Sequence, residues 1–226
     1  MEMTGNSYEP FTAERLAMVE SQLRRRGIHD ERVLAAMAKV PRHEFVEERR
    51  RDEAYADHPV LIAEGQTVSQ PYITAAMLQA AEIQPQDRVL EIGAGSGYQT
   101  GLLAELAAQV FAVERYSTLA EQARTKLESM GYANVTLVVG DGSLGLPEAA
   151  PFDVIIVSCG APRIPPALLA QMAPNGRMVI PVGEADQQSL QLLRKLPDGT
   201  TTARLLEGCR FVPLIGEQGF PGRSNW

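Results

Sequence analysis

One short segment of this sequence carries three glycines at alternate positions, directly after an apolar run. The segment reads Val89-Leu-Glu-Ile-Gly-Ala-Gly-Ser-Gly-Tyr98, and helix-forming residues follow it. Glycine permits a sharp turn, and its missing Cβ lets a ligand approach the backbone closely. Unpaired N–H groups and the helix dipole at the start of the following helix favour an anionic ligand group. The segment therefore predicts a strand, a ligand-binding turn and a helix.

The spacing of these glycines indicates which ligand the turn would bind. A dinucleotide-binding G-x-G-x-x-G motif would need glycine at position 98 or 100, where Tyr98 and Thr100 stand. Glu91 instead completes the E-x-G-x-G-x-G pattern of methyltransferases. A structural glycine-rich turn without a ligand is the alternative. The residues that we assign to the cofactor turn are Glu91, Gly93, Ala94, Gly95 and Gly97.

Two acidic residues follow the next two apolar runs. Glu114 ends the first of these runs, where a carboxylate can accept hydrogen bonds from both hydroxyls of a ribose. Asp141, beside Gly142, belongs to the same edge of the sheet and could accept a hydrogen bond from an adenine amino group. A surface carboxylate and a simple Asp-Gly turn are the alternatives. Together the two acids indicate a nucleoside ligand.

Composition and charge exclude several other classes of function. A net charge of −7 argues against a general nucleic-acid binder, which must neutralise phosphates. No apolar stretch approaches the roughly 20 residues of a membrane helix, and the first ten residues lack the order of a secretory signal. Two cysteines and three scattered histidines lack metal-ligand spacing, so we expect no metal and assign Cys159 to packing. We expect a cytoplasmic protein without membrane association.

Strands and helices are expected to alternate from residue 88 onward. Such alternation, with strands of buried type, is typical of a parallel sheet covered on both faces. We therefore predict a doubly wound, mostly parallel α/β sheet with helices on both faces, a Rossmann-like methyltransferase fold. The expected strands are 88–92, 110–114, 135–139, 152–158 and 177–182, and the expected helices are 98–107, 117–130 and 166–172.

The regions before and after this core have different patterns. Leu16, Val19 and Leu23 form one apolar helical stripe that ends at Gly27, and Asp30 is the expected N-cap of a second helix. The apolar positions of that second helix are Val33, Leu34, Met37 and Val40, and Pro41 ends it. Pro71 opens a third helix that runs to residue 82.

The last part of the chain predicts a β-hairpin and a tail. Residues 190–196 and 201–206 flank the turn Pro197-Asp-Gly199. The polar, glycine-rich residues 216–226 are expected to be loosely held. We predict one domain over 1–226, with an N-terminal helical extension (1–84), a cofactor-binding core (85–183), C-terminal strands (184–215) and the tail (216–226).

With these residues assembled, the chain resembles the protein-L-isoaspartate O-methyltransferases, which are protein-repair enzymes, from about residue 18 to residue 214. The narrowest signals are Gln66-Thr-Val-Ser-Gln-Pro-Tyr72 and Phe211-Val-Pro-Leu214. The resemblance implies methyl transfer from S-adenosyl-L-methionine to the free α-carboxylate of L-isoaspartyl residues in damaged proteins or peptides. The products would be S-adenosyl-L-homocysteine and an ester that collapses to a succinimide. We expect a monomer.

The resemblance also implies roles for individual residues. Ser69 matches the family's active-site serine, and Glu114 matches the acid that binds the ribose. Ser158-Cys-Gly160 and Ala63-Glu-Gly65 depart from the family's usual segments, which leaves the acceptor preference open. The further residues implied for the cofactor are Thr67, Gln70, Asp141 and Gly142, and those implied for the substrate, beside Ser69, are Ala161, Pro162 and Val212.

The chemistry needs no general base. An isoaspartyl carboxylate, with a pKa near ~3.5 by analogy with an α-carboxyl, is already ionised at neutral pH. What remains is orientation, which can contribute roughly 7–11 kcal/mol. Ser69 is expected to hydrogen-bond and aim the acceptor carboxylate, and N-capping of the helix at Pro71 is its alternative role.

Three other functions stay open at this point. The first is a methyltransferase of the same fold with a different acceptor. The second is a non-catalytic adenosylmethionine-binding or chaperone-like module that recognises damaged chains, although such a module needs no active-site serine beside an intact glycine turn. The third is a nicotinamide dehydrogenase, which Tyr98 and the lack of a proton-relay residue disfavour.

Overall fold

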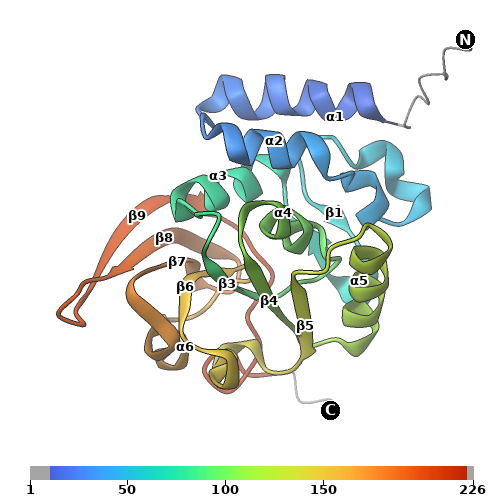
Figure 1. Cartoon of the computed structure of the whole chain (residues 1–226). Coiled ribbons are helices and arrows are strands. Elements are labelled where there is room, and N and C mark those ends of the chain that lie inside the picture. Colours follow the sequence, from blue (N-terminus) through green and yellow to red (C-terminus); the bar gives the residue numbers. More distant parts are fainter. Residues whose placement is uncertain (1–10, 223–226) are drawn as a thin grey trace, which may run out of the picture.

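A seven-stranded sheet forms the centre of the computed structural model, which describes residues 11–222 (Figure 1). The strand order is β5-β4-β3-β6-β7-β8-β9; the first five of these strands are parallel, and β8 and β9 are antiparallel to their neighbours. The strands are β3 (Arg88–Ile92), β4 (Gln109–Glu114), β5 (Val135–Val139), β6 (Phe152–Val157), β7 (Met172–Glu184), β8 (Gln187–Lys195) and β9 (Thr201–Cys209). The predicted fold class is confirmed.

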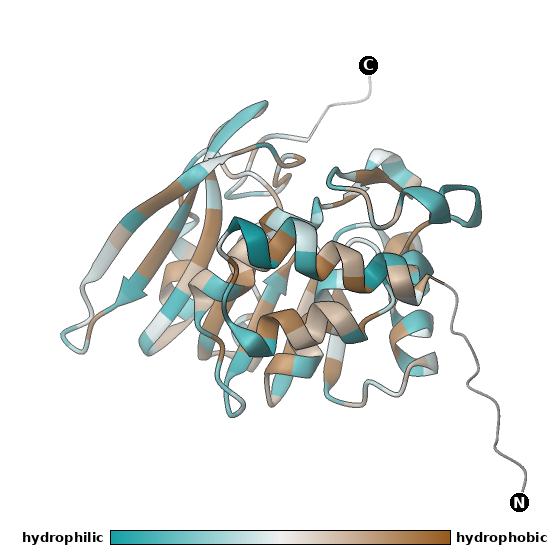
Figure 2. Ribbon diagram, turned by 90° about the horizontal axis from the view of Figure 1, so that it is seen from above, coloured by the Kyte–Doolittle hydropathy of each residue, from teal (hydrophilic) through white to brown (hydrophobic). Residues whose placement is uncertain are grey.

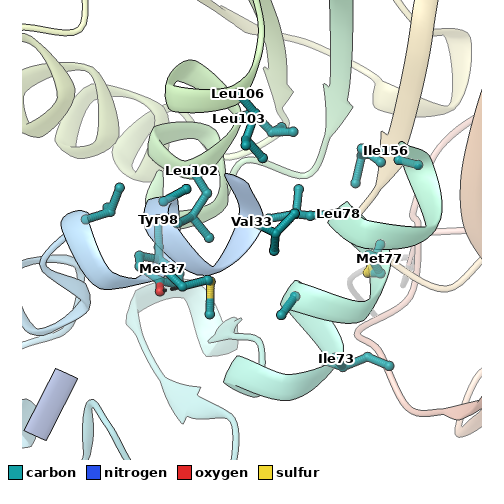
Figure 3. Packing of buried hydrophobic residues seen from close by; sticks show 14 of the residues in the cluster. Val33, Met37, Ile73, Met77, Leu78, Tyr98, Leu102, Leu103, Leu106 and Ile156 are labelled. Carbon is teal, nitrogen blue, oxygen red and sulfur yellow. Dashed lines mark hydrogen bonds between the residues drawn. The ribbon is translucent and has the colours of Figure 1, made fainter. Parts of the chain in front are cut away.

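The helices cover the two faces of this sheet unequally. One face packs against α2, α3 and α4 through a large apolar cluster that includes Met37, Met77 and Leu102, as Figure 3 shows. The other face is covered by α6 and short turns around Leu168. The helices are α1 (Thr12–Met18), α2 (Glu31–Lys39), α3 (Pro71–Ala81), α4 (Tyr98–Leu106), α5 (Ser117–Ser129) and α6 (Pro166–Gln171).

Short elements link these helices and strands. A two-stranded antiparallel sheet, β1 (Val60–Leu61) and β2 (Thr67–Val68), lies apart from the main sheet. The 3₁₀ turns are Arg24–Arg26, Arg42–Phe45, Glu48–Glu53, Ala63–Gly65, Gly142–Leu144 and Pro147–Ala149. Within residues 11–222, none of the helices combines the length and the apolar character that a bilayer crossing requires. Viewed from above, apolar residues concentrate on the strands and the inward helix faces (Figure 2).

The first helical segment differs from the predicted apolar stripe. Leu16 is 52% exposed, whereas Arg15 and Met18 are buried. A π-helical turn at Val19–Leu23 follows α1, and its wider spacing rotates the buried face relative to a regular α-helix. The prediction for Leu16 is therefore wrong, while the end of this segment at Gly27, with φ 94°, is confirmed.

The second and third helices agree with the sequence prediction. The Asp30 carboxylate accepts hydrogen bonds from the N–H groups of Arg32 (2.9 Å) and Val33 (3.3 Å), which makes it the N-cap of α2. The four predicted apolar positions are buried: three lie within α2, and the fourth, Val40, directly follows it. Pro71 occupies the first turn of α3, which ends one residue earlier than predicted.

The C-terminal region holds two corrections. The predicted hairpin of β8 and β9 is confirmed, but β7 starts at Met172, a residue predicted to be helical, and forms a further hairpin with β8. The described part of the tail is held by hydrogen bonds rather than loose. The Glu217 N–H donates to Asp141 Oδ2 (2.8 Å) and the Phe220 N–H donates to the Leu214 carbonyl (2.7 Å). Residues 223–226 lie outside the described residues.

Candidate active site

A cavity opens at the carboxyl ends of β3 and β4, where the glycine turn joins β3 to α4. Gly93, Gly95 and Glu114 line one side of it, and the C-terminal segment Val212–Ile215 lines the other. In open α/β sheets this edge, at the point where the strand order reverses, is where ligands bind. We name this space the cofactor cavity.

The glycines of the turn have different tasks. Gly93 (φ 84°) and Gly95 (φ 55°) adopt left-handed conformations that other residues rarely take, and both line the cofactor cavity. Gly97 (φ 87°) does not line it; a Cβ there would lie 3.0 Å from the Ala123 Cβ. Gly97 therefore allows α5 to pack closely against the turn. Ala94 is buried in the same alanine-rich contact between the turn and α5.

Glu114 is positioned by backbone groups. Its Oε2 accepts a hydrogen bond from the Gly95 N–H and its Oε1 accepts one from the Tyr116 N–H, both at 2.9 Å. The side chain is 5% exposed and lines the cofactor cavity. Each carboxylate oxygen has a second lone pair. The pair of oxygens can therefore accept hydrogen bonds from two neighbouring hydroxyls of a ligand.

Glu91 lies beneath the turn and does not line the cofactor cavity. It is fully buried, and Thr100 Oγ1 (2.6 Å) and Gln99 Nε2 (3.1 Å) donate hydrogen bonds to its carboxylate. Burial raises the pKa of Glu91 to about 7, although the hydrogen bonds from Thr100 and Gln99 oppose this shift. Its carboxylate faces a small pocket behind the turn, which we name the inner pocket.

A second hollow, which we name the acceptor groove, lies beside the cofactor cavity. Ser69, Gln70 and Tyr72 line it from the start of α3, and Phe211 and Val212 line it from the C-terminal segment. The carbonyl of Val212 accepts a hydrogen bond from the Gly160 N–H (2.8 Å), and the Leu214 N–H donates to the Gly160 carbonyl (2.7 Å). These bonds hold the C-terminal segment against the end of β6.

Ser69 does not cap α3, so the alternative role considered for it is wrong. The N-cap is Gln70, and no side chain bonds to the first turn of this helix. Ser69 follows β2 and lines both the acceptor groove and the inner pocket. In the part of the chain that the structure describes, its hydroxyl has no hydrogen-bond partner. The hydroxyl is therefore available to a bound group.

The cofactor cavity and the acceptor groove meet at three residues. Thr67, Ser158 and Val212 line both spaces. Thr67 and Val212 were predicted as site residues, whereas Ser158 was noted only as part of a departure from the family pattern. Its position directly after an apolar central strand was the signal that could have identified it. A donor in the cavity and an acceptor in the groove would therefore both lie next to these three residues.

Besides Ala94 and Gly97, five predicted site residues do not line the space that was expected for them. Gln70 lies in the acceptor groove, where its Nε2 donates to the Asp57 carbonyl (3.1 Å). The Asp141 carboxylate accepts hydrogen bonds from Ser143 and Glu217 and does not line the cofactor cavity, whereas the adjacent Gly142 does. The remaining three are Glu91 and the two residues of the Ala161-Pro162 pair.

Ala161 and Pro162 line neither the cofactor cavity nor the acceptor groove. The Ala161 N–H donates to the Pro181 carbonyl (2.9 Å) and its carbonyl accepts from the Gly183 N–H (3.0 Å), which turns the main chain toward β7. Its side chain is fully buried in the core, and Pro162 is exposed. The role of these two residues toward the acceptor stays a prediction, and they lie outside both spaces.

The departure at Cys159-Gly160 has a structural explanation. Burial raises the pKa of the Cys159 thiol, which agrees with its assignment to packing. A Cβ on Gly160 would lie 2.7 Å from Cδ of Gln188, a residue that is 2% exposed. The Gln188 Oε1 accepts a hydrogen bond from the Phe211 N–H (2.8 Å). Gly160 thus leaves room for the side chain that holds Phe211 in the acceptor groove.

Comparison with known proteins confirms the resemblance found in the sequence. The family model described as protein-L-isoaspartate(D-aspartate) O-methyltransferase matches residues 13–219. A protein-L-isoaspartate O-methyltransferase of Koribacter versatilis is 56% identical over 210 residues, which cover 93% of this chain and 94% of that protein. One of Methanoculleus marisnigri is 51% identical over 217 residues, covering 96% and 98%.

Solved structures of the same family have the same fold. A protein-L-isoaspartate O-methyltransferase aligns with a TM-score of 0.82 and 27% identity, over 92% of this chain and 67% of the other. A Plasmodium falciparum protein described as a member of this family was solved in complex with S-adenosyl-L-homocysteine. It aligns with a TM-score of 0.77 and 26% identity, over 89% and 98% of the two chains. The chain belongs to the protein-L-isoaspartate(D-aspartate) O-methyltransferase family.

Proposed function

We propose that this enzyme methylates the free α-carboxylate of L-isoaspartyl residues in damaged proteins and peptides, and so starts their repair through a succinimide. The observation that carries the proposal is the junction of two spaces at Thr67, Ser158 and Val212. One space suits a nucleoside-containing methyl donor, and the other is an open groove with the Ser69 hydroxyl in its wall. Membership of the family supplies the substrate class.

The residues of the cofactor cavity fit S-adenosylmethionine. The Glu114 carboxylate is held rigidly with lone pairs to spare, which suits the two ribose hydroxyls. Gly93 and Gly95 present backbone without side chains, and a Cβ on Gly93 would lie 3.5 Å from Cys159 Sγ. Of the predicted pair Asp141-Gly142, Gly142 lines the cavity. We propose that Gly93, Gly95, Glu114 and Gly142 hold the cofactor.

The acceptor side needs to orient a nucleophile that is already charged. Bound S-adenosylmethionine supplies a methyl group on a sulfonium, whose sulfur keeps the C–S electron pair as the carboxylate oxygen forms the new O–CH₃ bond. Ser69 donates a hydrogen bond to the acceptor carboxylate and limits its rotation. Val212 adds apolar surface at the junction, and Phe211 lines the acceptor groove beside it.

A labelling experiment tests this proposal. The enzyme is incubated with methyl-labelled S-adenosylmethionine and matched peptides that contain isoaspartate or normal aspartate, and base-labile methyl ester is measured. We expect label on the isoaspartyl peptide only. Equal labelling of both peptides would favour a methyltransferase with a different acceptor, and cofactor binding without any labelling would favour a non-catalytic binding module.

Three further expectations from the sequence stay proposals. They are the single-domain organisation, the monomeric state and the cytoplasmic location. Size-exclusion chromatography with light scattering measures the mass in solution, and we expect one chain of 24.6 kDa. Limited proteolysis that releases a stable fragment would contradict the single domain, and cell fractionation checks the location.

A further inference from the structure

We propose that the Ser158 hydroxyl is a second hydrogen-bond donor to the acceptor carboxylate, held in that orientation by Gln99. This inference deepens the proposed function and rests on it. It assigns to Ser158 a direct contact with the substrate, across the junction from Ser69. It also gives Gln99 and Glu91 a positioning role, because both lie behind Ser158 and do not line the acceptor groove.

Ser158 lies where the three spaces of the site meet. Only Thr67 and Ser158, among residues 11–222, line the cofactor cavity, the acceptor groove and the inner pocket together. Ser158 directly follows β6, and its N–H donates to the carbonyl of Ile92 at the end of β3 (2.8 Å). The strand order reverses between β3 and β6. The side chain is thus fixed to two central strands at the point where donor and acceptor must meet.

The hydrogen bonds around Gln99 leave the Ser158 hydroxyl free to donate. Gln99 Nε2 donates to Ser158 Oγ (2.6 Å) and to Glu91 Oε1 (3.1 Å), which uses both hydrogens of the amide. Above its pKa of about 7 the Glu91 carboxylate is ionised and can only accept, so it turns the amide nitrogen of Gln99, not the amide oxygen, toward Ser158. Ser158 Oγ therefore accepts from Gln99 and keeps its own hydrogen for a different partner. No acceptor for that hydrogen is found among the described residues.

Two hydroxyl donors can fix the orientation of a carboxylate, which one donor cannot do. A single donor leaves a carboxylate free to rotate about the hydrogen bond. Ser69 and Ser158 both line the acceptor groove, so each can bind one oxygen of the same carboxylate and fix its plane. Both serines keep their protons during transfer, because the carboxylate is already ionised and the leaving sulfur takes only an electron pair. Their effect is on orientation, which in-line transfer requires.

Substitutions at Ser158 test the inference. Ser158→Ala is expected to lower kcat on an isoaspartyl peptide about 10-fold to 100-fold, a loss below that of a full oxyanion donor. The KM for the peptide should change about threefold or less, and the Kd of S-adenosylhomocysteine should stay unchanged in calorimetry. Ser158→Thr keeps the hydroxyl and should restore kcat to within about fivefold of wild type.

Three further variants guard against a purely structural effect. Ser158→Cys keeps the size of the side chain with a weak donor, and should resemble Ser158→Ala while unfolding at the wild-type temperature. Gln99→Leu should lower kcat less than Ser158→Ala, and the double variant should be no worse than Ser158→Ala alone. Ser129→Ala removes an exposed hydroxyl at the end of α5 and should leave kcat unchanged.

The outcomes separate this inference from the proposed function. Wild-type enzyme that labels isoaspartyl peptides, together with a Ser158→Ala kcat within twofold of wild type, would overturn the role of Ser158 alone. A Ser158→Thr variant as slow as Ser158→Ala would also overturn it, because the hydroxyl would not matter. Wild-type enzyme that does not label the peptide would overturn the proposed function and this inference with it.

Discussion

The two halves of the active site are built differently. The cofactor side depends mainly on backbone groups: the glycine turn after β3 lines it, and the N–H groups of Gly95 and Tyr116 hold the Glu114 carboxylate. The acceptor side combines three segments that are distant in the chain: the start of α3, the end of β6 and the C-terminal segment. Side chains hold these segments in place: Gln188 Oε1 accepts from the Phe211 N–H, and Gln99 Nε2 donates to Ser158 Oγ.

Because the two sides are built differently, substitutions on them should change different kinetic and binding parameters. The cofactor side depends on the local conformation of the backbone. Substitutions that change this conformation should therefore change the affinity for the cofactor. The acceptor side is assembled from distant segments and depends on packing and on hydrogen bonds made by side chains. Substitutions there should therefore change turnover and the affinity for the peptide. The four predictions below test whether variants on the two sides separate in this way.

The largest effect is expected on the acceptor side. Ser69→Ala should lower kcat about 10²-fold to 10³-fold, because it removes a preorganised donor that no other described residue uses. Steady-state kinetics on an isoaspartyl peptide measure this loss, and calorimetry should show an unchanged Kd for S-adenosylhomocysteine. Ser69→Thr is the matched variant that retains a hydroxyl. A Ser69→Ala enzyme with wild-type turnover would contradict our assignment.

The next effect is expected on the cofactor side. Glu114→Gln replaces a carboxylate that accepts from Gly95 and Tyr116 and should raise the Kd of S-adenosylhomocysteine about 10-fold to 100-fold. The kcat at saturating cofactor should stay within about threefold. Isothermal titration calorimetry checks the affinity, with Glu121→Gln on the exposed face of α5 as the control. If Glu114→Gln lowered kcat and left the affinity for S-adenosylhomocysteine unchanged, the two sides of the site would not differ in the way proposed.

A smaller effect should follow from loosening the C-terminal segment. Gln188→Ala removes the acceptor of the Phe211 N–H and should raise the peptide KM about fivefold, with little change in cofactor affinity. The free energy of unfolding should fall by about 1–3 kcal/mol, because buried backbone groups lose their partners. Gln187→Ala, at an exposed position next along β8, is the control. Equal effects of both substitutions on KM would show that Gln188 does not position the groove.

The smallest effect is a change in pH dependence. Burial raises the pKa of Glu91 to about 7, above its value of 4.5 in the unfolded chain. Between about pH 4.5 and pH 7 the folded state therefore holds a proton that the unfolded state has lost, so the free energy of unfolding falls as pH rises through this window. Glu91→Gln cannot ionise and should show a flatter profile.

Chemical denaturation at pH 5 and pH 8 measures this slope. Glu128→Gln, at an exposed position of α5, should keep the wild-type slope. If Glu91→Gln and wild type lost the same free energy of unfolding between the two pH values, Glu91 would not be the buried group that titrates.

Much of the core could be predicted because its signals are local. The ends of the apolar runs in the sequence coincide with the ends of the buried strands. Asp30 was predicted as the N-cap of α2 because its side chain can accept hydrogen bonds from the first turn, and the structure confirms it. Leu16 could not be placed, because a π-helical turn changes the helical period and has no sequence signature of its own. The start of β7 at Met172 depended on pairing with a neighbouring strand, which is a long-range interaction.

The site shows the same division. Sequence by itself determined the glycine turn, Glu114 and the family, since these depend on residues close together in the chain and on motifs in order. Tertiary structure alone decided that Gly97 packs against α5 and that Ala161 pairs with β7. It also decided that Ser158 stands where the cofactor cavity meets the acceptor groove. The reason is physical: a side chain's neighbours across a sheet are set by strand order and register, which local sequence does not encode.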